Sequence, residues 1–385
     1  MKCQREKFQL QRKYAYLNCA YMSPLMKKVE NAGIKGMKKK RKPFHISPDD
    51  FFHDTETLRR LYSQLIDNSE PDRVVVIPSA SYGIANVVHN LPGTPGKIIL
   101  ADEQFPSNVY PWQSLESSGY QICVVTPPKS SARAQSWNQA LLDEIDDKTR
   151  VVALGQVHWS DGTLFQLKEI REKLDKVGGL LVIDGTQSVG ALPFSIKEIR
   201  PDALICAGYK WLMGPYSIGL AYYGEAFDKG KPIEENWINR LNSENFAELV
   251  NYQPAYRDGA LKYEVGEHSN FILIPMLLTA IKQLLKWTPE GIQQYCDVLM
   301  QEAISELCEM GYKIEEAACR GHHLFGIRLP EKVSPEVLGR SLKQHRVSVS
   351  FRGSAIRVSP HVYNDEMDVR KLLNAMKAPI FASKG

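Results

Sequence analysis

Short apolar runs rich in β-branched residues recur between Arg73 and Gly224, and helix-like stretches separate most of them. This alternation is typical of βα units around a mostly parallel sheet, because each crossover carries the chain back over one face of the sheet. Runs that are apolar throughout indicate strands with both faces covered by helices. The sequence therefore predicts an α/β fold with a seven-stranded, mostly parallel sheet, with strands at residues 73–77, 97–101, 121–126, 151–154, 180–183, 203–206 and 218–223.

The pattern changes after Gly230, which marks a second unit. Residues 236–258 are polar and aromatic, and an amphipathic helix is predicted at 275–286. Beyond it we predict helices at 291–310, 335–345 and 365–376, a strand at 323–329 and a β-pair within 347–358, which describe a smaller α+β unit. We expect an N-terminal segment at 1–15, a large domain at 16–255 and a small C-terminal α+β domain at 256–385.

Charge and composition exclude several classes of protein. Forty-eight Lys and Arg residues against 44 Asp and Glu residues give a net charge of only +4 over 385 residues, so no nucleic-acid partner is expected. The basic run at 35–42 continues a helix-like stretch, so we interpret it as a solvated helix end. The apolar run at 271–281 is too short to span a membrane, and the polar, charged residues 1–13 do not form a secretory signal, so a cytoplasmic location is expected.

The seven cysteines are odd in number, scattered and never spaced as CxxC. This pattern disfavours a disulfide framework and a zinc site, so neither a disulfide nor a bound metal is expected.

Two strand ends carry the strongest chemical signal. The apolar strand at 180–183 ends in Asp184, and the strand at 203–206 runs into Tyr209 and Lys210. Open α/β sheets bind ligands at the carboxyl ends of their strands. A lysine in apolar surroundings has a lowered pKa, as a Schiff-base amine requires. The sequence thus offers a buried carboxylate and a reactive amine at one sheet edge.

A nucleotide site would need a glycine-rich turn between a strand and a helix, and none is present; residues 93–97 precede a strand and do not form a phosphate loop. Pyridoxal phosphate fits better, because it needs a lysine for the aldehyde and a carboxylate that keeps the pyridine nitrogen protonated. Its phosphate suits a helix N-terminus, and Ser79, Ala80 and Ser81 lie between a predicted strand and a helix.

Other strand-end loops offer partners for the cofactor ring. Phe105 follows a strand and is expected to stack on the ring. Gln187 and Asp161 are candidate partners for the phenolic oxygen O3′. His158 either contacts the ring or is satisfied by backbone, and the sequence leaves both open.

These motifs, in this order, resemble the class V aminotransferases. This family of fold-type I pyridoxal phosphate enzymes includes cysteine desulfurases, kynureninases and an isopenicillin N epimerase-like group. The resemblance extends from residues 16–24 to residues 357–364. It implies that Lys210 forms the Schiff base, Asp184 pairs with the pyridinium and Gln187 donates to O3′. It also implies a phosphate cup formed by Ser79, Ala80, Ser81 and Tyr209.

The resemblance has further implications for substrate and assembly. Arg357 matches the arginine that binds the substrate α-carboxylate in this family. Asp161 takes the place of an asparagine in desulfurases. Phe105 is similar to the stacking aromatic of the kynureninase branch. Ser269 and Asn270 lie in the segment that reaches the neighbouring subunit's phosphate, which implies a homodimer with shared active sites.

The chain differs from the cysteine desulfurases of this family in one respect that bears on its reaction. Desulfurases carry a nucleophilic cysteine shortly before the carboxylate arginine, and residues 342–357 contain none. We therefore expect an enzyme that acts on a small amino acid through an external aldimine and a Cα carbanion, with transamination as the default. The alternatives are a C–S lyase or an epimerase without a catalytic cysteine, or a non-catalytic binding protein that retains the fold.

Overall fold

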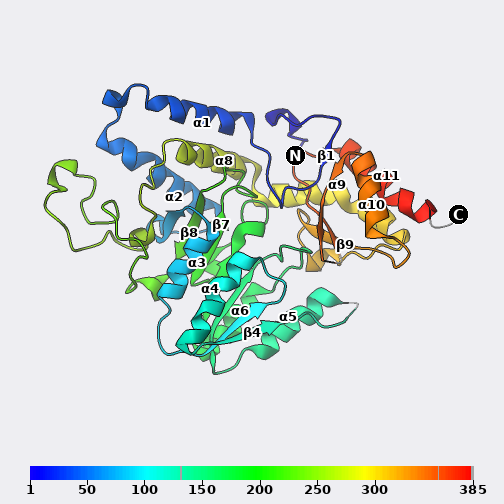
Figure 1. The fold of residues 1–385 in the computed structure, drawn as a ribbon, viewed down its shortest axis with the longest axis horizontal. Coiled ribbons are helices and arrows are strands. Elements are labelled where there is room, and N and C mark those ends of the chain that lie inside the picture. Colours follow the sequence, from blue (N-terminus) through cyan, green and yellow to red (C-terminus); the bar gives the residue numbers. More distant parts are fainter. Residues whose placement is uncertain (131, 354, 383–385) are drawn as a thin grey trace.

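A computed structural model describes residues 1–130, 132–353 and 355–382. Its centre is a seven-stranded sheet in the order β2-β8-β7-β6-β5-β3-β4 (Figure 1). The strands are β2 (Val74–Ile77), β3 (Lys97–Ala101), β4 (Gln121–Val125), β5 (Thr149–Gly155), β6 (Leu180–Asp184), β7 (Ala203–Ala207) and β8 (Gly219–Tyr223).

The sheet is mostly parallel, as predicted. Neighbouring strands from β4 to β7 pair in parallel, whereas β8 pairs antiparallel with both β7 and β2. The described segment between β7 and β8 contains no helix, whereas a parallel crossover usually contains one, so β8 pairs antiparallel with β7.

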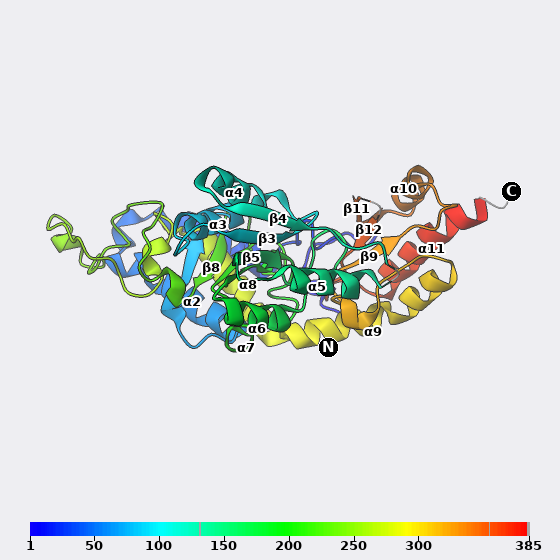
Figure 2. The same ribbon diagram turned by 90° about the horizontal axis from the view of Figure 1, so that it is seen from below.

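Helices cover both faces of the sheet, which explains why its strands are continuously apolar (Figure 2). Alternate residues of a strand point to opposite faces. Val75 and Ile77 thus pack with α3 (Ala80–His89) and α4 (Tyr110–Gln113), while Val74 and Val76 pack in the core on the other face. That second core contains α2 (His53–Leu65), α5 (Arg133–Glu144), α6 (Leu167–Val177), α7 (Ile196–Ile199) and α8 (Leu273–Trp287).

The C-terminal unit is built on a three-stranded antiparallel sheet in the order β11-β12-β9. The strands are β9 (Phe325–Arg328), β11 (Ser350–Arg352) and β12 (Ala355–Val358), and the helices are α10 (Pro335–Gln344) and α11 (Glu366–Ala382). The N-terminal strand β1 (Ala15–Tyr16) pairs in parallel with β10 (Val347–Ser348), so both ends of the chain meet in this unit.

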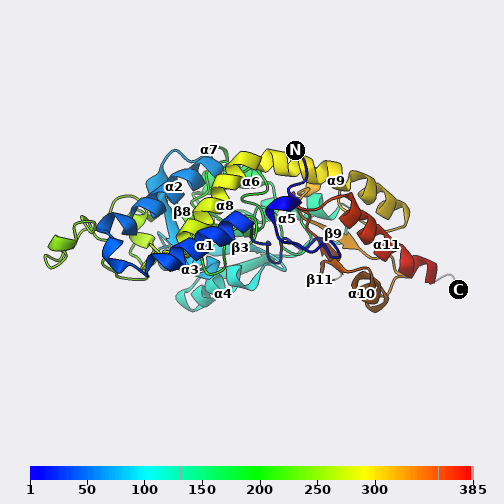
Figure 3. The ribbon, with the colours of Figure 1, turned by 90° about the horizontal axis from the view of Figure 1, so that it is seen from above.

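Helix α9 (Pro289–Glu309) joins the two units (Figure 3). Its residues Ile292 and Cys296 pack in the core of the large sheet, while Met300 and Leu307 pack in the core of the C-terminal unit. Helix α8 packs against α2 and α1 (Lys27–Lys39), which lie with the large sheet. The domain limits at residues 15 and 255 remain a prediction.

Within the described part of the chain, no helix combines the length and the apolar character that a membrane crossing requires. The cytoplasmic location remains a prediction.

Candidate active site

A cavity of about 320 Å³ opens at the carboxyl ends of the parallel strands. The loops that follow five strands, β2, β3, β5, β6 and β7, line it. This is the edge at which open α/β sheets place their ligands. Its lining includes nine residues that the sequence analysis considered, namely Ser79, Ala80, Ser81, Phe105, His158, Asp184, Gln187, Tyr209 and Lys210.

Lys210 lies in the turn after β7, with only 6% of its surface exposed. The N-terminal segment holds this turn, because the Ser23 amide and hydroxyl both donate to the Tyr209 carbonyl at 3.1 Å. Burial lowers the pKa of Lys210 to about 8; Arg357 and Arg352 act in the same direction, and Asp184 opposes them. A buried amine of this kind has a substantial neutral, nucleophilic fraction near neutral pH.

Asp184 ends strand β6 and lines the same cavity. Its Oδ1 accepts a hydrogen bond from the Thr186 amide at 3.0 Å, which fixes the orientation of the carboxylate. Gln187, one turn further on, donates its Nε2 to the Ala20 carbonyl and accepts from the Trp211 indole at 2.9 Å through Oε1. One amide hydrogen of Gln187 is therefore left for a ligand.

The N-terminus of α3 forms another wall of the cavity. Ser79 caps the helix by accepting the Tyr82 amide through Oγ at 3.2 Å, and its hydroxyl lies 3.0 Å from that of Ser81. The first-turn amides of a helix have no intrahelical partner, and the helix dipole favours an anion there. This wall is suited to a phosphate group.

Aromatic side chains line the side of the cavity near Lys210. The Lys210 Nζ lies 5.3 Å from the centre of the Phe105 ring, and Phe105 meets Trp159 edge to face at 5.4 Å. Trp159 was not predicted as a site residue, because nothing in its spacing shows that the loop after β5 turns it toward Phe105.

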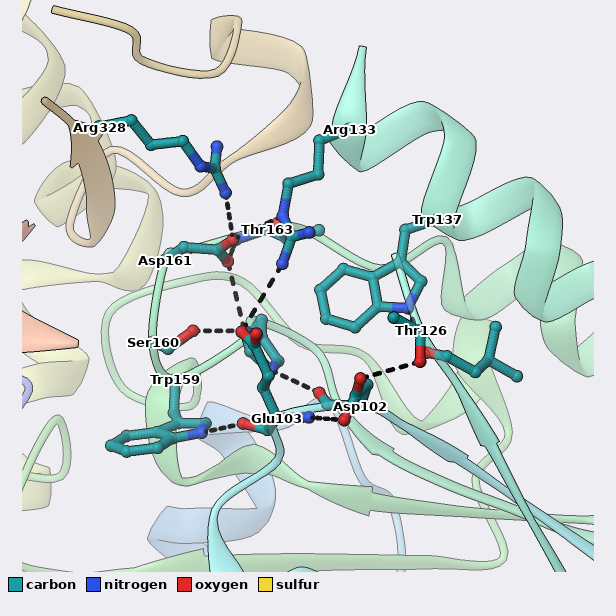
Figure 4. A network of polar contacts seen from close by, with 12 residues as sticks. Asp102, Glu103, Thr126, Arg133, Trp137, Trp159, Ser160, Asp161, Thr163 and Arg328 are labelled. Atoms are coloured by element: carbon teal, nitrogen blue, oxygen red, sulfur yellow. Dashed lines mark hydrogen bonds and ion pairs between the residues drawn. The ribbon is translucent and has the colours of Figure 1, made fainter. Parts of the chain in front are cut away.

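His158 and Asp161 belong to a polar network beside the cavity. Figure 4 shows Asp161 in this network. His158 Nε2 lies 3.1 Å from the Asp102 carbonyl, and Nδ1 lies 3.0 Å from the Ser160 hydroxyl and 3.3 Å from the Asp161 carboxylate. His158 therefore lines the cavity and is also satisfied by a backbone carbonyl, while its contact with a cofactor ring remains a prediction.

Asp161 lies outside the cavity lining, and its carboxylate faces two cations instead. Its Oδ2 lies 3.2 Å from Arg133 Nε of α5 and 3.0 Å from Arg328 Nη2 of β9, so it links the large unit to the C-terminal unit. Burial would raise the pKa of Asp161, but the hydrogen bond and attraction from His158, the Thr163 amide and Arg133 together hold it below its ordinary value.

The turn that carries Asp161 also requires Gly162. Its φ is +81°, and a Cβ at this position would lie 2.4 Å from the Leu324 carbonyl oxygen of the C-terminal unit. Only glycine tolerates both the left-handed backbone and this close approach. The backbone is therefore fixed where the two units meet.

Arg357 is almost fully buried, yet much of its guanidinium has no partner. Nη1 donates to the Trp159 carbonyl at 2.7 Å, while Nε and Nη2 have no hydrogen-bond acceptor among the described residues. Burial lowers the pKa of Arg357 to about 9, and Arg352 contributes further. Nε and Nη2 form one edge of the guanidinium, and such an edge can donate hydrogen bonds to both oxygens of a carboxylate.

Comparison with known proteins identifies the family. The family model described as aminotransferase class-V matches residues 40–372. This chain belongs to the class-V aminotransferase family. It is 26% identical over 327 residues to the uncharacterized aminotransferase YcbU of Bacillus subtilis, covering 84% of this chain and 83% of that protein. It is 25% identical over 261 residues to a cysteine desulfurase of Pectobacterium atrosepticum, covering 66% of this chain and 62% of that protein.

Solved structures confirm the class-V fold, that of the fold-type I pyridoxal phosphate enzymes. The apo cysteine desulfurase of Thermococcus onnurineus superposes with a TM-score of 0.83 at 18% identity, covering 99% of both chains. A C-DES mutant whose cofactor carries covalently linked glycine gives a TM-score of 0.84 at 18% identity, covering 97% of this chain and 98% of that one.

Membership of the class-V family indicates pyridoxal phosphate as the cofactor, as predicted, and the cavity fits it. Its volume is in the range of small-molecule sites, and its walls provide the amine of Lys210, the carboxylate of Asp184 and the free amides at the start of α3.

Besides Asp161, three predicted site residues lie outside the cavity lining. Arg357 contacts Trp159 at the edge of the cavity. Ser269 and Asn270 lie outside the lining, and the Asn270 side chain accepts the Ile272 and Leu273 amides at the start of α8. Their roles at a cofactor remain predictions.

Replacing Asp161 with asparagine should destabilise the fold by about 3 kcal/mol, because two partly buried guanidinium groups lose their shared carboxylate. Urea unfolding followed by tryptophan fluorescence measures the change. The matched control is Asp67→Asn, which breaks an exposed ion pair with Lys197 and should stay within about 1 kcal/mol of wild type. Equal effects of the two variants would contradict a structural role for the Asp161 network.

Proposed function

We propose that this protein is a pyridoxal phosphate-dependent aminotransferase that acts on a small amino acid. The observation that carries the proposal is the buried amine of Lys210, with its lowered pKa, in the same cavity as the carboxylate of Asp184. An ordinary structural lysine gains nothing from such burial, because desolvation of an ammonium is costly.

Each wall of the cavity has a role in this proposal. Ser79, Ser81 and the first amides of α3 would bind the phosphate, and Asp184 would hold a proton on the pyridine nitrogen. When bound, the cofactor supplies an electron sink for the charge that develops on the substrate Cα. Lys210 Nζ would remove the proton from Cα, and the free edge of Arg357 would orient the substrate carboxylate.

The positions of the cysteines favour transamination over desulfuration. None of the cysteines among the described residues lines the cavity. Cys19 is fully buried, and burial raises the pKa of its thiol to about 12. A thiol of this kind is not a nucleophile near neutral pH, because only the thiolate attacks.

We also propose a homodimer in which Ser269 and Asn270 approach the cofactor phosphate of the second subunit. Asn270 is exposed in the single chain, and Ser269 is partly exposed. A sedimentation measurement of the holoenzyme should therefore give twice the mass of one chain.

The decisive experiment mixes the holoenzyme with single amino acids and follows the visible absorbance. Transamination predicts loss of the band with each reactive amino acid, release of the matching keto acid, and return of the band on adding a second keto acid. Pyruvate with sulfide would instead indicate a C–S lyase, and a racemised product would indicate an epimerase. A colourless protein that takes up no cofactor would overturn the enzyme proposal.

Capture of pyridoxal phosphate by the apo-protein should accelerate as the pH rises, with a midpoint close to 8. The neutral amine is the nucleophile, and its fraction grows as the pH passes the lowered pKa of Lys210. Stopped-flow absorbance from about pH 6 to about pH 11 measures the rate. A midpoint near the ordinary lysine value of about 10.4 would contradict this environment for Lys210.

A further inference from the structure

A second arginine, Arg352, lies beside Arg357 on one face of the β11-β12 ladder. Arg352 pairs with Ala355 across the ladder, and Ala355 and Arg357 are two residues apart on β12. Directly paired residues and residues two apart share a face of a sheet. The register therefore places both arginine side chains on the same side, at neighbouring positions.

Both guanidinium groups lie over the same indole ring at the edge of the cavity. The Cζ atom of Arg352 lies 5.3 Å from the Trp159 ring centre, and that of Arg357 lies 5.9 Å from it. Trp159 lines the cavity and contacts Phe105, which in turn lies against Lys210. Both guanidinium groups thus lie over Trp159, and both lower the pKa of Lys210.

Neither arginine is neutralised by the protein. Across the described ranges, no carboxylate lies within ion-pairing distance of Arg352 or Arg357. Arg352 Nη1 donates to the carbonyl of its neighbour Phe351 at 2.8 Å, and its Nε is buried without a partner. Two adjacent, incompletely paired guanidinium groups repel each other and favour anionic ligands.

The proposed function uses only one of these groups. The free Nε and Nη2 of Arg357 form one edge, and one edge is enough to bind both oxygens of an α-carboxylate. Arg352 therefore has donors that a neutral amino acid would leave unused.

We propose that Arg352 binds a second anionic group on the substrate side chain, so that the preferred substrates are acidic amino acids. This inference rests on the proposed function, in which Arg357 takes the α-carboxylate. A carboxylate and a phosphate ester would both satisfy the guanidinium, so the test includes aspartate, glutamate and O-phosphoserine.

The first test compares charged and neutral substrates of equal size. For wild-type holoenzyme, kcat/KM for glutamate should exceed that for glutamine by roughly 10- to 100-fold, as expected for a charge-assisted contact. Arg352→Gln should remove most of this preference while changing the glutamine value by less than about 3-fold. Arg352→Lys should retain part of it, because the charge remains. Aspartate and O-phosphoserine, each compared with asparagine, show which anion is preferred.

The matched control is Arg370→Gln, which removes an exposed cation of α11 and should leave the preference unchanged. An Arg352→Gln variant that loses glutamate and glutamine activity equally would overturn the inference, as would a wild-type enzyme that prefers glutamine. In both cases amino acids still react, so the proposed function stands. If no amino acid changes the absorbance, the proposed function itself fails.

A binding measurement tests the site without turnover. Calorimetry with the holoenzyme should show glutarate binding more tightly than butyrate, because only glutarate has a carboxylate for each arginine. Arg352→Gln should abolish this difference, and equal affinities in wild type would count against a second anion site.

Discussion

The Lys210→Ala variant is expected to lose turnover by about 10³-fold or more while still binding pyridoxal phosphate. In the proposed function Lys210 supplies both the amine that holds the cofactor and the base that moves the Cα proton, and a general base alone contributes about 10²- to 10⁴-fold. The phosphate wall of Ser79 and Ser81 is untouched by the substitution, so non-covalent binding should remain.

Single-turnover absorbance with the preferred amino acid measures this loss, and equilibrium dialysis measures cofactor binding. Lys197→Ala provides the control, because Lys197 is an exposed lysine of α7 that pairs with Asp67. Normal turnover in Lys210→Ala would contradict a role for Lys210 in the reaction. Loss of turnover in both variants would point to a general effect of removing lysines.

The Asp184→Asn variant should lower kcat by about 10²-fold or more with little change in fold stability. Asparagine keeps the shape and the acceptor for the Thr186 amide, but it has no charge with which to hold a proton on the ring nitrogen. Because Asp184 raises the pKa of Lys210, its loss should also move the midpoint for cofactor capture below about 8.

The value of kcat and the pH midpoint for cofactor capture test two different effects of Asp184. Asp143→Asn is the control, since Asp143 is an exposed residue of α5 that contacts only Gln139 among the described hydrogen-bond partners. A normal kcat in Asp184→Asn would contradict the assigned role. A midpoint that moves upward would contradict the electrostatic coupling between Asp184 and Lys210.

The large sheet could be predicted because burial leaves a direct pattern in the sequence. All seven strands lie within two residues of their predicted ends, because apolar runs mark them. Six of these strands are mostly buried, whereas the edge strand β4 is largely exposed. Helix α8 was predicted to begin at Pro275 but begins at Leu273, because the Asn270 side chain caps the preceding turn. The sequence does not show whether a side chain such as Asn270 turns back on its own backbone.

Some residues of the candidate site could be predicted from the sequence and others could not. Asp184 and Lys210 could be found because Asp184 ends a buried strand, Lys210 lies shortly after another, and parallel strands end at one edge. The direction of Asp161 could not, because it depends on Arg133 and Arg328, which are distant in sequence. The pairing of Arg352 with Arg357 over Trp159 likewise depends on the β11-β12 register.

The role of Lys210 is tested most directly by locating the cofactor on the chain. Borohydride reduction of the holoenzyme fixes the bond between the cofactor and its lysine, and peptide mass spectrometry then identifies the modified residue. We expect one phosphopyridoxyl group per chain, on Lys210 and absent from the Lys210→Ala variant. A label on another lysine, or a reduced protein with no label, would contradict this expectation.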